Sequence, residues 1–132
     1  MQEAAHLRNI RESIEEIEEA IRVGIEKRQR TIGFHCSAAA ADLFELYLHK
    51  KGVLPIAQII KHDWCASKNK LNEKLPFDFE KKQEILELIV SIEERRNVLC
   101  YGTQQPELRM EEMLLKFNKL RTLFKELHTY EE

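Results

Sequence analysis

Apolar residues recur at helical spacing along most of the chain. Between residues 3 and 29 they lie three or four positions apart, and the stripe consists of Leu7, Ile10, Ile14, Ile17, Ile21 and Ile25. This spacing places them on one face of a helix, while Glu and Arg fill the other face. Gly24 falls within the last turns of the stripe, where a glycine weakens a helix or admits a close neighbour. The pattern predicts a long helix over residues 3–29.

The next apolar segments differ in length and character. Residues 31–51 have a middle of small side chains, AAAA, and a bulky second half that contains Leu43, Phe44, Leu46, Tyr47 and Leu48. This composition predicts a second long helix that packs closely against several neighbours and stops at Gly52. Residues 54–64 are interpreted as a short helix with Pro55 in its first turn. The polar, lysine-rich residues 66–76 are interpreted as a loop.

Two further apolar stripes occupy the last third of the chain. The first stripe consists of Ile85, Leu88, Ile89, Ile92 and Leu99, and it predicts a helix that begins at Lys81 or Lys82 and stops at Gly102. Asp78 is a candidate N-cap for this helix. A fifth helix should begin at Pro106, and its stripe contains Met110, Met113, Leu114, Phe117, Leu120, Phe124 and Leu127.

These elements together indicate the fold class. No stretch alternates apolar and polar residues over a sustained length, so no sheet is expected. We therefore predict a single all-α domain over residues 1–132, an up-and-down bundle of four long helices plus one short helix. The predicted core contains Ile14, Ile17, Ile21, Leu43, Leu46, Ile89 and Leu120.

Composition narrows the class of protein. Charged residues make up 33% and hydrophobic residues 43% of the 132 positions, and the formal net charge is −2. The chain as a whole therefore lacks the excess of positive charge that is typical of nucleic-acid-binding proteins. A nucleic-acid-binding site would have to be a local basic patch. No apolar run reaches the roughly 18 residues of a membrane span, and the first residues lack a signal-peptide core. We expect a cytoplasmic protein that does not enter a membrane, with Cys36, Cys65 and Cys100 as reduced thiols.

Familiar cofactor and metal motifs are missing. The chain contains no GxxxxGK[ST], GxGxxG, HExxH or GxSxG sequence. The run from His62 to Cys65 holds metal-ligating residue types, but no second pair follows at a zinc-site spacing. The sequence thus predicts no cofactor and no metal site, and Trp64 in this run is expected to anchor the short helix.

The segment SIEERRNVLCYG, residues 91–102, is the strongest candidate site. On a helix Asn97 and Tyr101 are i,i+4 neighbours, with Arg95 and Arg96 beside them. An arginine with an amide and a phenol suits an anionic ligand such as phosphate. The alternative is an ordinary last helical turn, in which an arginine complements the helix dipole. His35 is either a buried, hydrogen-bonded histidine or, if it faces the Arg96 cluster, a further ligand-binding residue.

The order and spacing of two segments resemble the HEPN family (higher eukaryotes and prokaryotes nucleotide-binding). The first is Phe34–His35 followed by small residues and then bulky ones, and the second is Arg96–Asn97–Val98–Leu99–Cys100–Tyr101. The resemblance covers roughly residues 10–125. Many family members are metal-independent ribonucleases that act as dimers, with an arginine, a polar residue and a histidine in a late helix. The resemblance implies that Arg96 stabilises charge and that Asn97 is the polar partner.

Tyr101 stands where the family has its histidine. Imidazole exchanges protons near neutral pH, whereas phenols ionise only around pH 10. The resemblance therefore implies a homodimer that binds RNA or a nucleotide at Arg96, Asn97 and Tyr101, with weak or absent ribonuclease activity. An active ribonuclease of the toxin–antitoxin type, with Tyr101 as general acid and Arg96 as its catalytic partner, is the first alternative. The second is a non-catalytic protein-interaction module.

The resemblance also implies a partner. Many HEPN proteins pair with a small nucleotidyltransferase, encoded separately or fused. This chain lacks a Gly-Ser pair with downstream paired aspartates. A nucleotidyltransferase partner would therefore be a separate chain.

Overall fold

The computed structural model describes residues 1–131, which are helical throughout their regular parts. Four helices have 20 to 22 residues, α3 is shorter, and two 3₁₀-helices are labelled η. The order is α1 (Glu3–Val23), η1 (Ile25–Lys27), α2 (Gln29–Lys50), η2 (His62–Ala66), α3 (Lys68–Lys74), α4 (Lys82–Tyr101) and α5 (Glu107–Glu126). No strand occurs among residues 1–131, which confirms the all-α prediction.

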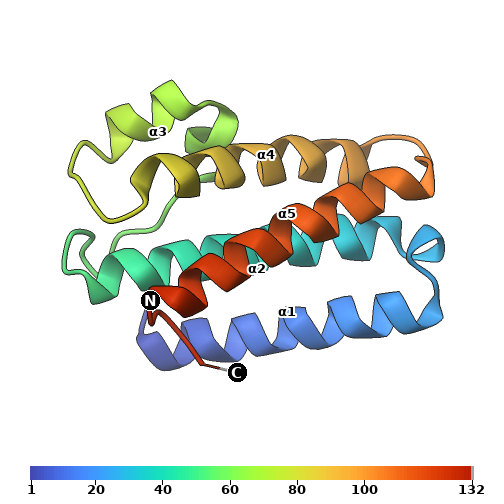
Figure 1. Cartoon of the computed structure of the whole chain (residues 1–132), viewed down its shortest axis with the longest axis horizontal. Helices are drawn as coiled ribbons and strands as arrows, with labels where there is room; N and C mark the ends of the chain where they lie inside the picture. Colours follow the sequence, from blue (N-terminus) through green and yellow to red (C-terminus); the bar gives the residue numbers. More distant parts are fainter. Residues whose placement is uncertain (132) are drawn as a thin grey trace.

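Helix α2 is the central element of the fold. It packs against α1 on one side and against α4 and α5 on the other, and α4 also packs against α5. Figure 1 shows that chain direction alternates along α1, α2, α4 and α5. The α1–α2 and α4–α5 connections therefore lie at the same end of the molecule, at the right of Figure 1. We call this the connection end.

Glycine and proline mark the helix ends as expected, with one correction. The first helix ends at Val23 rather than continuing to residue 29, because Gly24 adopts φ +124°, which residues with a side chain rarely adopt. The Gly24 N–H still bonds to Ala20 O at 3.0 Å, which closes the last turn. At the other predicted ends, Gly102 follows α4 and Pro106 precedes α5, as the sequence indicates.

The middle of the chain differs from the prediction in two places. Residues 54–64 do not form a helix, since the chain turns there and only η2 is helical. The predicted loop at residues 66–76 instead contains α3, whose N-cap Ser67 accepts a hydrogen bond from Lys70 N at 3.1 Å. Trp64 lies in η2 and is partly buried against the core, so it anchors η2 and not the helix expected over residues 54–64.

The start of α4 is also built differently. Asp78 Oδ1 accepts a bond from the neighbouring Phe79 N at 3.0 Å, so the expected N-cap role of Asp78 is wrong. The N-cap is Lys81, whose φ of 62° is left-handed and whose side chain makes no capping bond. Within the described residues, Lys81 and His128 are the non-glycine positions with positive φ.

Most of the predicted core is buried. Ile17, Leu43, Leu46, Ile89 and Leu120 are each at most 5% exposed, and Ile14 is partly buried. The prediction that Ile21 belongs to the core is wrong, because its side chain is 53% exposed. Since α1 packs against no long helix other than α2, only a narrow strip of α1 is covered.

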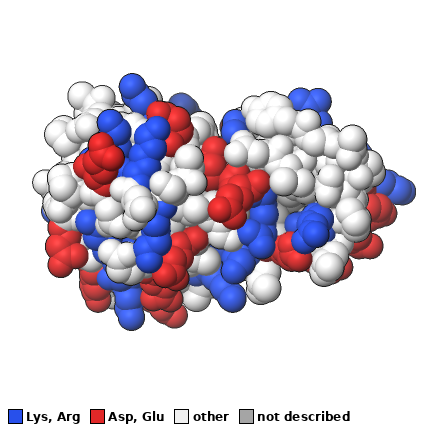
Figure 2. Space-filling model, turned by 90° about the horizontal axis from the view of Figure 1, so that it is seen from above, with Lys and Arg blue, Asp and Glu red and all other residues white. Residues whose placement is uncertain are grey.

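The surface carries mixed charge. Figure 2 shows Lys and Arg interspersed with Asp and Glu over much of one face, with a broader uncharged area towards the connection end. This mixture agrees with the small net charge of the sequence. No helix within residues 1–131 combines the length and apolar character needed to cross a membrane.

Candidate ligand-binding site

The segment SIEERRNVLCYG forms the last part of α4, at the connection end, where α2 begins. Gly33 of α2 allows close contact here, because a Cβ built on it would lie 2.7 Å from Leu99 Cβ. Gln29 locks the junction: its Nε2 donates to Leu99 O at 3.2 Å and Thr103 O at 3.0 Å. The start of α2 therefore holds the end of α4 through side-chain bonds to its backbone.

Arg96 and Tyr101 form a direct pair on α4. Arg96 Nη2 donates to Tyr101 Oη at 3.2 Å, and the guanidinium carbon lies 5.5 Å from the centre of the tyrosine ring. This distance permits a cation–π attraction in addition to the hydrogen bond. The Arg96 side chain is only 16% exposed, whereas Tyr101 is 70% exposed. A ligand approaching from solvent would thus meet Tyr101 first and Arg96 behind it.

Glu93 holds Arg96 from the other side. Its Oε1 lies 3.6 Å from Arg96 Nη1, and its Oε2 lies 3.1 Å from His62 Nδ1. Glu93 is buried, so this carboxylate offsets part of the charge of Arg96 in a poorly solvated place. The arginine is therefore positioned between Glu93 and Tyr101 before any ligand arrives.

An open hollow of about 370 Å³ lies between the start of α2 and the end of α4. It is lined by Arg30, Thr31, Phe34, His35, Cys100 and Tyr101. The structure thus places His35 in the same hollow as Tyr101, which the sequence alone could not decide. His35 is half-buried, and its Nδ1 lies 3.2 Å from Ser13 Oγ, so one ring nitrogen is tied to α1. We call this feature the Tyr101 hollow.

Two arginines act on the thiol in this hollow. Burial raises the pKa of Cys100, while the positive charges of Arg96 and Arg30 act in the opposite direction. Both guanidinium groups are therefore near enough to Cys100 to favour its thiolate form electrostatically. Arg30 is exposed and was not among the residues predicted from the sequence. Only the packing of α2 on α4 brings it to the site.

The other two predicted residues lie outside the hollow. Arg95 Nη1 donates to Ser91 Oγ at 2.6 Å, and Arg95 Nη2 lies 3.8 Å from Glu112 Oε2 on α5. This arginine thus faces the α4–α5 seam. Asn97 is exposed and is not among the residues that line the hollow. Of the predicted residues, Tyr101 and His35 line the hollow. Arg96 does not line it but is bonded to Tyr101, whereas Arg95 and Asn97 neither line the hollow nor share that bond.

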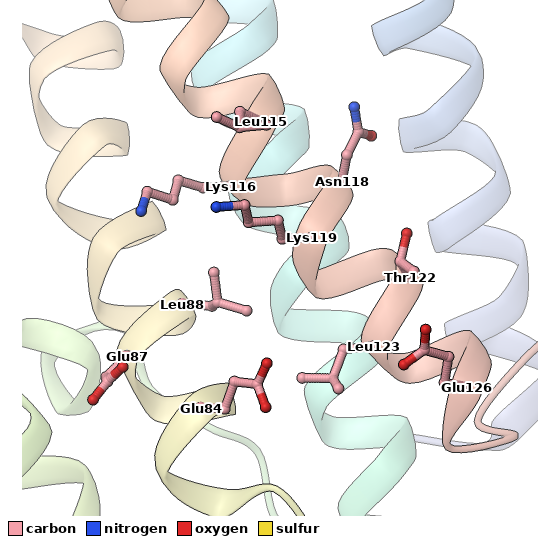
Figure 3. A pocket seen from close by; sticks show the side chains of 10 residues that line it. All are labelled: Glu84, Glu87, Leu88, Leu115, Lys116, Asn118, Lys119, Thr122, Leu123 and Glu126. Atoms are coloured by element: carbon pink, nitrogen blue, oxygen red, sulfur yellow. The ribbon is translucent and has the colours of Figure 1, made fainter.

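A second depression lies between α4 and α5, on the side away from the connection end. It has a volume of about 600 Å³, and Leu88 and Leu123 line it together with lysines and glutamates (Figure 3). Charges of both signs face it, including Lys119 and Glu84. Such a mixture does not select an anion, and none of the predicted site residues lines this groove.

Comparison of the chain with protein-family models, with curated proteins and with solved structures gives no match. The HEPN resemblance therefore rests on the residues of this chain alone.

Proposed function

We propose that this chain is a HEPN-like up-and-down helical bundle that acts as a homodimer and binds RNA or a nucleotide at the Tyr101 hollow. Its ribonuclease activity is weak or absent. The observation that carries this proposal is the Arg96–Tyr101 pair beside a hollow that also contains Arg30 and His35. Cationic and aromatic groups meet there on one open surface.

This combination suits the two parts of a nucleotide. Guanidinium groups bind phosphate through paired hydrogen bonds, and aromatic faces stack on bases without demanding a particular sequence. Phe34 is 52% exposed, so both Phe34 and Tyr101 present ring surface to solvent at the hollow. Arg30 supplies an exposed positive charge, and Arg96 supplies one that is held in place. Single-stranded RNA, whose bases are free to stack, is the class of ligand that these groups favour.

The weak activity follows from the chemistry of the tyrosine. Cleavage of RNA by attack of a ribose 2′-OH on the adjacent phosphate requires proton transfer near neutral pH. Tyr101 Oη accepts a hydrogen bond from the Arg96 guanidinium, and a phenol exchanges protons poorly at this pH. We therefore expect binding without efficient turnover.

His35 supports a second candidate function, an active metal-independent ribonuclease. An imidazole in the Tyr101 hollow could exchange the proton that the phenol cannot, with Tyr101 acting as general acid. In that case His35→Gln would abolish cleavage of single-stranded RNA by the purified protein. Under the first proposal there is little cleavage for this substitution to remove.

The binding test compares variants of the purified protein by fluorescence anisotropy with a labelled single-stranded RNA. We expect Arg96→Ala and Arg30→Ala to weaken binding, because each removes a cation beside the hollow. Affinity of the unchanged protein should fall as salt rises, since counterions are released from phosphate. The matched control is Arg8→Ala, an exposed arginine on the first turns of α1 at the other end of the molecule. Equal binding by all four proteins would contradict the proposed site.

The separate nucleotidyltransferase remains a proposed partner. An interaction module without RNA binding is the remaining alternative. It predicts that none of the variants changes RNA affinity, because the unchanged protein would not bind RNA.

A further inference from the structure

A buried polar cluster lies at the end of the molecule opposite the connection end. His6 comes from the first turns of α1, and Asp42, Glu45 and His49 come from the second half of α2. His6 is 0% exposed and Glu45 is 7% exposed. We call this group the His6–His49 cluster. It contacts none of the residues of the Tyr101 hollow and has no role in the proposed RNA binding.

Each histidine of the cluster is oriented by a hydrogen bond at its Nδ1 atom. His6 Nδ1 lies 2.8 Å from Asp42 Oδ1, and His49 Nδ1 lies 2.9 Å from Leu54 O. A carbonyl oxygen only accepts, so His49 Nδ1 carries the proton and its Nε2 presents a lone pair when the ring is neutral. A carboxylate beside His6 Nδ1 favours the same tautomer for that ring. This is how metal-binding histidines are commonly oriented in proteins.

The Nε2 atoms of both rings are buried and lack a hydrogen-bond partner. His6 Nε2 and His49 Nε2 are two of the four buried side-chain atoms in this state within the described residues. Glu45 faces the same place: its Oε1 accepts a bond from Ile60 N at 2.7 Å, and its Oε2 lies 3.8 Å from His6 Nε2. One ligand atom from each of His6, Glu45 and His49 can be chosen so that all three lie within 4.8 Å of one another.

We propose that His6, Glu45 and His49 bind a divalent transition-metal ion of the zinc class. Two imidazole nitrogens and one carboxylate oxygen form a donor set that Zn²⁺ accepts, with a water completing a tetrahedral site. Ligand atoms around zinc are about 3.3 Å apart when each lies about 2.0–2.1 Å from the ion. The present separations therefore require only a small inward movement of side chains.

Protonation of His6, without any metal ion, is the competing explanation for how the charges of this cluster are balanced. A protonated His6 would bridge Asp42 and Glu45, and its Nε2 would then have a weak partner at 3.8 Å. This arrangement leaves His49 Nε2 buried and unsatisfied, which is costly. A divalent ion instead serves both Nε2 atoms and the carboxylate. It would also offset the negative charges of Glu45 and Asp42, which lie beside His6.

The location indicates a structural role for the ion. The cluster joins the beginning of α1 to the end of α2 and, through Leu54 O and Ile60 N, to the irregular segment after α2. His49 and His35 are 14 positions apart on α2, which is about 21 Å along a helix. Loss of the metal should therefore lower stability without directly altering the Tyr101 hollow.

The test is a titration of chelator-stripped, refolded protein with ZnCl₂ by calorimetry, with thermal unfolding measured in parallel. We expect one Zn²⁺ per chain and a rise in Tm, because a ligand that binds only the native state stabilises it. His49→Gln should remove this binding. Asp42→Asn, which keeps all three ligands, should weaken it by about 10- to 100-fold, as for other partners of ligating histidines.

The control is His62→Gln, which removes the histidine nearest in sequence to Cys65 and should leave zinc affinity unchanged. Circular dichroism must show that each variant is helical. If His49→Gln fails to fold, Asp42→Asn decides the question. No zinc binding by the unchanged protein, or equal binding by His49→Gln and Asp42→Asn, would overturn the proposal. Neither result would bear on RNA binding, which is measured separately.

Discussion

At the scale of single residues, the contact between Arg96 and Tyr101 determines what the candidate site can do. The arginine donates to the phenol oxygen and is in turn paired with Glu93. A phosphate ligand would have to compete with Tyr101 for part of the guanidinium. The phenol therefore positions the cation, whereas an imidazole in its place would also exchange protons.

Substituting this tyrosine tests that reasoning. Tyr101→His should gain metal-independent cleavage of single-stranded RNA, by about 10²- to 10⁴-fold over the unchanged protein, the usual contribution of a general acid or base. Tyr101→Phe should only lose the bond to Arg96 and remain inactive. The measurement is RNA degradation at neutral pH in chelator-containing buffer, with circular dichroism confirming that each protein stays folded.

Two controls make the result specific. The double variant Arg96→Ala/Tyr101→His should lose the gained activity, because the charge stabiliser is gone. Efficient cleavage by the unchanged protein that disappears in both Tyr101→Phe and Arg96→Ala would instead establish the active ribonuclease.

The three cysteines should differ in reactivity, because only Cys100 lies in the Tyr101 hollow. Burial raises the pKa of Cys65 to about 12 and also raises that of Cys36, and both side chains are buried. Cys100 is partly exposed in the Tyr101 hollow. We predict that a thiol reagent modifies Cys100 first at neutral pH, and that the other two react only after unfolding in urea. Cys100→Ser should abolish the fast phase.

Residue spacing predicted part of this site. It placed Arg96 and Tyr101 on one helix, but their bond joins residues five apart, which ordinary i,i+4 reasoning does not reach. The approach of His35 and Arg30 depends on how α2 packs against α4, which no local pattern encodes. No residue of the His6–His49 cluster was singled out from the sequence. Asp42, Glu45 and His49 lie three and four positions apart on one helix, but His6 is 39 positions from Glu45.

At the scale of elements, α2 connects both candidate sites. Its first turns line the Tyr101 hollow, its middle is buried by α1, α4 and α5, and its last turns hold Glu45 and His49. Buried positions occur on every side of this helix, which explains why its apolar residues do not form a single stripe. Changes in the middle of α2 should therefore affect the whole molecule.

A pair of substitutions tests the central place of α2. Leu46 is 1% exposed, so Leu46→Ala should lower the free energy of unfolding by about 2–5 kcal/mol. Ile21 on α1 is 53% exposed, and Ile21→Ala should change it by no more than about 0.5 kcal/mol. Urea unfolding followed by circular dichroism measures both. Similar losses for the two variants would contradict this assignment of the core.

Helices α1, α4 and α5 were predictable because each repeats one apolar face over many turns, and because Gly102 and Pro106 mark clear ends. The segment after α2 was not predictable from the sequence, because its backbone is held by hydrogen bonds to side chains of α2. Ile60 N donates to Glu45, and Leu54 O accepts from His49, while Ile56 and Ile59 remain exposed. Helix α3 carried a readable signal that was missed, the N-cap Ser67 before a helical run.

At the scale of the whole molecule, exposed apolar side chains gather near the Tyr101 hollow. Phe34 and Tyr101 line the hollow, and Val98, one turn before Tyr101 on α4, is 43% exposed. The face in Figure 2 is also least charged towards this connection end. Large exposed apolar side chains beside a cationic site suit a symmetric interface in which two α4 ends approach each other.

The homodimer is therefore testable through this surface. We expect the unchanged protein to sediment as a dimer at tens of micromolar, a concentration at which a micromolar-affinity dimer is largely formed. Phe34→Ser should shift it towards monomer, because the substitution removes apolar area beside the hollow. The matched control is Leu115→Ser, which changes an equally exposed side chain in the separate α4–α5 groove and should leave the dimer intact.

The outcomes also separate assembly from ligand binding. A composite site requires both chains, so Phe34→Ser should weaken RNA binding together with dimerisation. If Phe34→Ser remains dimeric but binds RNA less well, Phe34 acts by stacking on a base, and the interface lies elsewhere. A purely monomeric unchanged protein that still binds RNA through Arg96 would show that one hollow is sufficient, and the two-chain arrangement implied by the HEPN resemblance would be wrong for this chain.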